Sequence, residues 1–388
     1  RTFHNNEYAW YGYDSFLFKM WVQTSMAHNM TVVDCRMQKP SFCLCIYYAD
    51  HERVDGEKGF RAYGGRKEDR IERGGADIGR PQEMFSAVCA QTVTEWIDPP
   101  YGGQTPYLPI FPEEKCAREG RYILPAECGR RQGEIGEYSE PVFQRRLLIL
   151  FHGYCILWDY LEGGGRHRYD CLYHPMGSFE NEEGLVFQQR ARFSEDPFGA
   201  GQFIMNCHSV RREGILCLRF HGAQARVNGK DIVDNLPETA VWRIWPQTGN
   251  VTIGRYPQTG DTFTEENRKA SEGYLKEPLK KVVSFSTEGE RAGFITLLES
   301  GERTGRIKSV ECDSFDSILI TEDSGESWKV SARGLENRDD EIFVKILGRK
   351  EKEGRQLGLD KKSHFAGVPS GSLHRSSGGG LLCGNIDF

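Results

Sequence analysis

The sequence predicts an all-β protein in which two antiparallel sheets stack on each other. Along most of the 388 residues, short runs rich in Val, Ile, Phe, Tyr and Thr alternate with Gly, Pro, Asn and Asp, as strands alternate with turns. No long amphipathic helix pattern is present, and the 44 glycines fit a chain with many turns. Two stacked sheets are the natural way to bury so many strands.

The clearest single element is a β-hairpin. Arg146–Phe151 has a strand pattern, His152-Gly153 provides a two-residue turn, and Tyr154–Tyr160 forms the returning strand. The same pattern predicts further strands at Gly214–Phe220, Ala240–Trp245, Lys281–Ser286, Gly293–Leu298, Ser317–Thr321 and Glu341–Leu347.

Three segments interrupt the strand pattern. Glu52–Arg80 is charged and Gly-rich, and Pro99–Gly136 combines Pro, Gly and aromatic residues. We expect both to be solvated surface insertions. The alternative for the second segment is that it forms one wall of a groove. The Ser/Gly-rich tail Gly367–Gly380 is expected to be flexible. The twelve cysteines form no CxxC pair. Cys116 and Cys128 are candidates for a disulfide, which the sequence alone does not decide.

Composition argues against two classes of partner. The formal net charge of -6 argues against a nucleic-acid ligand. No apolar run reaches the length of about 18 residues that a membrane span requires, so no membrane partner is expected. Because the chain begins at Arg1 rather than Met, we expect it to be processed or to be a fragment.

The most informative stretch is Ser25–Asp34, in which His28 and Asn29 precede an apolar, β-branched run. A titratable, polar pair at the edge of a β-core is where a site is commonly built. The simpler alternative is a loop histidine that caps a strand.

Several segments resemble, in order, those of the heparinase II/III-like polysaccharide lyases. Met26–Asp34 is similar to the family's AHNTVVVDG segment, and Val142–Leu150 followed by Tyr154–Gly163 is similar to its R-R strand, tight turn and DYLEG strand. His167–His174 resembles the family's H-x-Y-D-x-x-x-H segment, and Phe294–Glu299 resembles a later strand that ends in Glu.

This resemblance implies a domain organisation. Residues 1–300 would form a large β-sandwich domain, and residues 301–388 a small C-terminal β-domain with a flexible tail. The N-terminal (α/α) toroid of such enzymes has no counterpart in this chain, so a toroid domain or chain is an expected partner.

The implied activity is β-elimination on an acidic, uronate-containing polysaccharide. Such a reaction needs donors that neutralise the carboxylate, a base for the α-proton, and an acid for the leaving oxygen. The alternatives are a uronyl C5-epimerase and a non-catalytic carbohydrate-binding or assembly module. The resemblance also implies that the protein is secreted or periplasmic, and it leaves a homo-oligomer open.

The resemblance implies roles for five residues. His28 aligns with the family's site histidine in the β-domain, and Asn29 beside it would bind substrate or serve the structure. Tyr138 is the expected catalytic tyrosine and Tyr63 the second candidate, with ordinary core packing as the alternative for both. Arg145, on the R-R strand, would contact the polyanion.

No metal and no cofactor are expected. Some family members hold a structural zinc through positions that read Met30 and Gln144 here, and neither side chain is a good zinc ligand. His167 and His174 are expected to bridge strands rather than to react.

Overall fold

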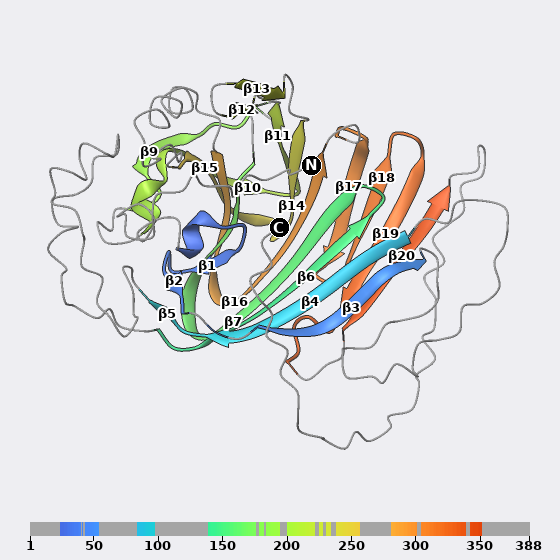
Figure 1. Ribbon diagram of the computed structural model, residues 1–388, viewed down its shortest axis with the longest axis horizontal. Coiled ribbons are helices and arrows are strands. Elements are labelled where there is room, and N and C mark those ends of the chain that lie inside the picture. Colours follow the sequence, from blue (N-terminus) through green and yellow to red (C-terminus); the bar gives the residue numbers. More distant parts are fainter. Residues whose placement is uncertain are drawn as a thin grey trace, which may run out of the picture.

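The computed structural model describes the residues 24–39, 41, 43–53, 84–97, 139–175, 178–181, 184–194, 200–221, 225–227, 230–233, 238–256, 281–300, 304–338 and 342–350. The predicted all-β fold is confirmed, and every strand pair within these ranges is antiparallel (Figure 1). The helices in these ranges are the short 3-10 segments η2 (Ser25–Ala27) and η5 (Ala200–Phe203). No helix there is both long and apolar enough to cross a membrane.

A 12-stranded sheet forms the body of the molecule. Its main path runs through β3 (Leu44–Arg53), β4 (Met84–Thr94), β6 (Val142–Phe151), β7 (Tyr154–Tyr173), β16 (Lys281–Ser300), β14 (Thr239–Trp245), β11 (Leu216–His221) and β8 (Ser178–Glu180). Four further strands lie off this path, namely β1 (Thr31–Val33), β9 (Gln188–Arg192), β10 (Met205–Glu213) and β15 (Thr248–Arg255).

The long strands β7 and β16 belong to both layers of the sandwich. The first part of β7 pairs with β6, and its last part, around Cys171, pairs with Thr31 of β1. Likewise, the first part of β16 pairs with β15 and its last part pairs with β14. One hydrophobic core contains side chains from both layers, including Val32, Phe285 and Phe220.

The predicted hairpin is confirmed and extends further than expected. His152 and Gly153 both have positive φ, 48° and 82°, as a tight two-residue turn between strands of normal twist requires. The two strands predicted at Lys281–Ser286 and Gly293–Leu298 form the single strand β16. The polar, Gly-containing residues between them suggest a turn in the sequence, but they remain paired with β7.

A four-stranded sheet packs on the opposite face of β6, β7 and β16. It consists of β17 (Ile307–Ser314), β18 (Ser317–Glu322), β19 (Glu326–Arg333) and β20 (Phe343–Lys350), drawn in orange at the right of Figure 1. Alternate residues of β7 face it: Trp158 is fully buried in the shared core and donates a hydrogen bond from Nε1 to the carbonyl of Phe315 at 2.8 Å. The division into domains at residues 300 and 301 stays a prediction.

Two small sheets complete the described fold. Strand β2 (Met37–Gln38) pairs with β5 (Trp96–Ile97), and β12 (Ala225–Val227) pairs with β13 (Lys230–Val233). The expected tail, the disulfide candidates Cys116 and Cys128, and nearly all of the two expected insertions lie outside the described residues.

Candidate functional site

The His28–Asn29 loop lies at one end of the second layer. Helix η2 ends at Ala27, and His28 continues in extended conformation with φ -119° and ψ 159°. The buried residues of β1 follow directly and pair with the end of β7, so the apolar run fixes where the loop sits. Both His28 and Asn29 are half-buried.

Asn29 is fastened through its side-chain oxygen to His174. Its Oδ1 accepts hydrogen bonds from the backbone N–H and from Nδ1 of His174, each at 2.9 Å. His174 is fully buried, and its ring meets the ring of Tyr256 edge-on at 4.9 Å. Because a backbone N–H can only donate, Oδ1 of Asn29 must be the acceptor. The amide Nδ2 of Asn29 has no hydrogen-bond partner among the described residues and can therefore donate to a ligand.

An ion pair between the half-buried Arg146 and the buried Asp159 supports the loop. Arg146 donates from Nε and Nη2 to the two oxygens of Asp159, at 2.5 and 2.9 Å, and donates from Nη1 to the carbonyl of Asn29. Asp159 is fully buried. Burial disfavours the charge on Arg146, but the attraction of Asp159 keeps its pKa above the ordinary value. This bidentate pair ties β6 and β7 to the loop that carries His28.

Arg145 points to the other face of β6 and does not approach His28. Its side chain is buried, and it donates to Oε1 of Gln91 and to the carbonyls of Gly334, Asn337 and Arg338. The guanidinium therefore attaches the segment after β19 to the large sheet. In this structure Arg145 fills a structural role in place of the expected contact with a polyanion.

The expected site tyrosines, Tyr138 and Tyr63, lie outside the described residues. Two other tyrosines lie near the loop. Burial raises the pKa of Tyr173 well above its ordinary value, with Cys171 and Asp159 adding to the effect, and burial also raises the pKa of Tyr256. Neither side chain is suited to lose a proton near neutral pH.

The remaining candidates from the sequence are structural. His167 Nδ1 lies 2.7 Å from Oδ2 of Asp34, and Oδ1 of the same carboxylate accepts a hydrogen bond from the backbone N–H of Arg168 at 2.9 Å. This contact ties the end of β1 to β7, in line with the bridging role expected for His167. Met30 is half-buried beside the core, and Gln144 is buried on β6.

A cluster that the sequence analysis missed combines His152, Glu322 and Glu326. One potential ligand atom from each lies within 4.8 Å of the others, a set that a divalent cation can use. His152 Nε2 lies 3.0 Å from Oε1 of Glu322, which also accepts a hydrogen bond from the hydroxyl of Tyr154 at 2.7 Å. The cluster joins the hairpin turn to the four-stranded sheet, and no sequence spacing reveals it because the fold alone brings these residues together.

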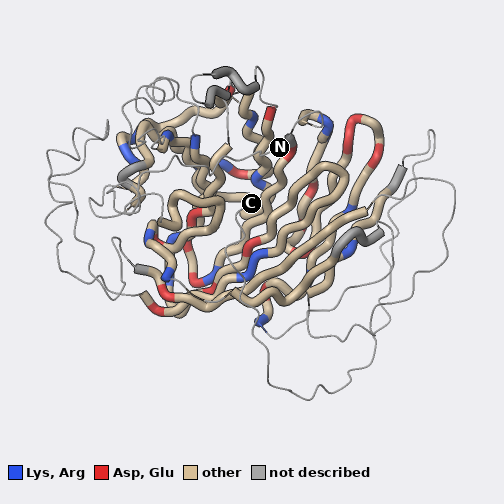
Figure 2. The backbone as a smooth tube through the Cα atoms, viewed as in Figure 1, with Lys and Arg blue, Asp and Glu red and all other residues tan. Residues whose placement is uncertain are grey.

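Among the described residues, Lys and Arg do not gather apart from Asp and Glu in the view of Figure 2. Basic and acidic residues are interspersed along the described strands (Figure 2). The electrostatics of a site must therefore come from local groups.

No protein-family model matches the chain, and no curated protein matches it. Among solved structures, heparan sulfate lyase HepC from Pedobacter heparinus is similar, with 6% sequence identity and a TM-score of 0.35. The match covers 87% of this chain and 32% of that chain, so this protein spans about a third of the lyase. A similarity at this level does not identify a shared activity.

Proposed function

We propose that this protein is the β-domain part of a polysaccharide lyase that cleaves an acidic, uronate-containing polysaccharide by β-elimination. In this reaction the C5–H bond and the C4–O bond break, a C4=C5 double bond forms, the proton passes to a base, and the leaving oxygen receives a proton. The charge that develops on the uronate carboxylate needs hydrogen-bond donors that are already oriented.

The orientation of Asn29 carries the proposal. His174 holds Oδ1 of Asn29 with two hydrogen bonds, so the amide Nδ2 is left to donate beside His28. A fixed amide donor next to an imidazole is suited to stabilise an enediolate, and losing one such donor typically costs roughly 3 kcal/mol of transition-state stabilisation. The Arg146–Asp159 pair keeps the loop in place without adding a mobile charge.

The proposal needs two groups beyond this loop. Tyr138 is the expected base or acid, with Tyr63 second, and a helical toroid supplies the rest of the site. Because the substrate is an extracellular polymer, the proposal places the protein outside the cytoplasm, secreted or periplasmic.

The test is the ultraviolet absorbance of unsaturated uronate after incubation with alginate, ulvan and glycosaminoglycans. The protein is assayed together with its toroid, on a longer chain or as a co-purifying partner. His28→Ala and Asn29→Asp should abolish the signal. The matched control is His221→Ala, because His221 Nδ1 pairs with Glu238 at 2.8 Å on β11, away from the loop.

Three results decide between the functions. Product formation that survives in both variants would exclude this loop as the site. Deuterium uptake from solvent at C5 without cleavage would identify an epimerase. Binding of a polymer with neither reaction would identify a binding module.

A further inference from the structure

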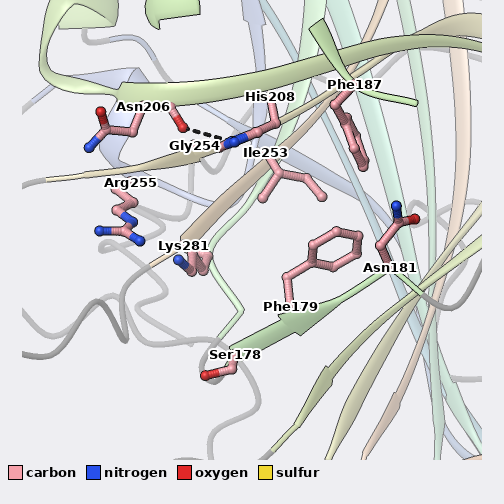
Figure 3. Close-up of a pocket in the computed structure, with 10 residues that line it drawn as sticks. All are labelled: Ser178, Phe179, Asn181, Phe187, Asn206, His208, Ile253, Gly254, Arg255 and Lys281. Carbon is pink, nitrogen blue, oxygen red and sulfur yellow. Dashed lines mark hydrogen bonds between the residues drawn. The ribbon is translucent and has the colours of Figure 1, made fainter. Parts of the chain in front are cut away.

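A pocket of about 310 Å³ opens at the same end of the second layer as the His28–Asn29 loop. Figure 3 shows its lining residues, which come from β8, β10, β15 and β16 and their flanking segments: Ser178, Phe179, Asn181, Phe187, Asn206, His208, Ile253, Gly254, Arg255 and Lys281. Its volume lies at the lower end of the range for small-molecule sites.

Two cations face each other in this pocket. Arg255 on β15 and Lys281 on β16 are direct cross-strand partners, an arrangement that disfavours folding for like charges. Among the described residues, no carboxylate lines the pocket and neither cation has an ion-pair partner. Burial, together with the charge of Arg255, lowers the pKa of Lys281 to about 8.

A β-bulge shapes the wall beside these cations. The register between β10 and β15 shifts between Met205 and His208, so that two residues of β10 lie opposite the one residue Gly254. Asn206 takes positive φ there, 50°, and its side chain has no hydrogen-bond partner among the described residues. Bulges commonly re-aim side chains next to binding sites.

Glycine is required at position 254 for this close approach. A Cβ at Gly254 would lie 2.5 Å from Cγ2 of Ile204 and 3.1 Å from Sγ of Cys207. The backbone of β15 therefore runs close to Ile204 and Cys207, two buried residues of the core.

The opposite wall is aromatic. Phe179 and Phe187 pack edge-to-face at 5.9 Å, and Phe187 meets His208 edge-on at 6.2 Å. The Nδ1 of His208 donates to the carbonyl of Asn206 at 3.0 Å, which fixes the ring (Figure 3). Such a wall offers an apolar surface to the C–H face of a sugar ring, while Arg255 and Lys281 offer charge.

We infer that this pocket is a subsite for one anionic sugar residue, whose carboxylate or sulfate group lies between Arg255 and Lys281 while its ring packs against Phe179. Half-buried Lys281 and exposed Arg255 are adjacent cations with no acidic neighbour among the described residues, and an oxyanion between them would offset their repulsion.

The subsite fits the path of a polymer that also reaches His28. Val283 of β16 pairs with Tyr173, the last residue of β7, and Lys281 lies two residues before Val283. Asn29 is hydrogen-bonded to His174, the residue that directly follows β7. With neighbouring strands roughly 4.8 Å apart, β15 lies about 10 Å from β7. The identity of the ligand as part of a polysaccharide rests on the proposed function.

The test measures binding without turnover. Isothermal titration is carried out with the full chain and in the His28→Ala background, using a sulfated glycosaminoglycan oligosaccharide, its desulfated uronate-containing counterpart, and a neutral oligosaccharide of equal length. Arg255→Gln and Lys281→Gln should each weaken binding of the anionic ligand about tenfold or more. Lys281→Arg should retain it, and the exposed Lys329→Gln on β19 is the matched control.

Retained binding by the desulfated ligand would identify the carboxylate as the bound group, and its loss would identify the sulfate. The inference is overturned if the neutral oligosaccharide binds as tightly, or if both Gln variants bind like the wild type. If the Gln variants lose binding but the wild-type protein shows no lyase activity, the subsite stands and only the lyase proposal is refuted. If cleavage depends on His28 but is unchanged in Arg255→Gln and Lys281→Gln, the lyase proposal stands and only the subsite is refuted.

Discussion

Asn29 accepts both hydrogen bonds that His174 directs at it, so a loop residue is locked by the end of a strand 145 positions away in the chain. This relationship separates two properties of Asn29. Its oxygen serves the fold, and its amide nitrogen is available for chemistry.

Replacements of Asn29 should therefore separate stability from activity. Asn29→Asp keeps an acceptor for His174 and should fold, but it removes the donor and should lower kcat of the proposed lyase by about 100-fold or more. Asn29→Ala leaves the buried N–H groups of His174 without an acceptor and should lower the free energy of unfolding by about 1–3 kcal/mol. Urea denaturation and turnover measured on the same preparations check both effects, and an active Asn29→Asp variant would contradict the proposed role.

Arg146 and Asp159 should contribute to stability mainly through their interaction with each other. Asp159→Leu leaves the half-buried guanidinium of Arg146 without its counter-charge and should cost about 2–4 kcal/mol of stability. The double variant Arg146→Met with Asp159→Leu should recover part of this loss, because it removes both charges from the interior. A double-mutant cycle of unfolding free energies measures the coupling, and simple additivity of the two single effects would be the opposite result.

Arg145 should matter for stability and not for ligand binding. Arg145→Met removes the donor for the carbonyls of Gly334, Asn337 and Arg338 and should lower the free energy of unfolding by about 2–4 kcal/mol. Affinity for an acidic oligosaccharide should stay within about twofold of the wild type where the variant remains folded. Weakened affinity without loss of stability would return Arg145 to the role expected from the sequence.

Lys281 should make stability depend on pH. Its pKa is lowered from 10.5 to about 8, so the unfolded chain binds its proton more tightly than the folded one. The destabilising charge is fully present below about pH 8 and disappears as the pH rises towards 10. Lys281→Met should therefore melt at a higher temperature than the wild type at pH 7, and the difference should shrink at pH 9. Equal melting temperatures at pH 7 would show that the charge carries no cost.

The same proton should control anion binding. Among the described residues, Arg255 and His208 are the other titratable groups that line the pocket, and no acid does. Affinity for an acidic oligosaccharide should fall as the pH rises through about 8, because Lys281 loses its charge there. Lys281→Arg should remove this dependence, since arginine stays charged. A decline of affinity that persists unchanged in Lys281→Arg would assign it to another group.

Local sequence predicts the strands well and the site only in part. The Arg146–Phe151 and Tyr154–Tyr160 strands follow from apolar runs around a His-Gly turn, and they form as expected. The prediction splits β16 because Thr287–Arg291 is polar and contains glycine, features that tertiary pairing with β7 overrides.

The pocket is invisible in the sequence for a related reason. Lys281 and Arg255 are separated by a long segment, and only the β15–β16 register makes them neighbours. The partners of Arg145 and Arg146 are equally hidden in the sequence. Alternation along a strand shows that two successive residues face opposite sides, but it does not show what each side contacts.

Because β7 and β16 run through both layers and also carry the face covered by the four-stranded sheet, no layer can detach without breaking pairs in another. The described fold should therefore lose its structure in one step. Backbone amides in the middle of β7 and β16 should exchange with solvent at the rate of global unfolding. The ends of β15 and β16 that line the pocket should be rigid, because β16 continues from there along β7 to the four-stranded sheet.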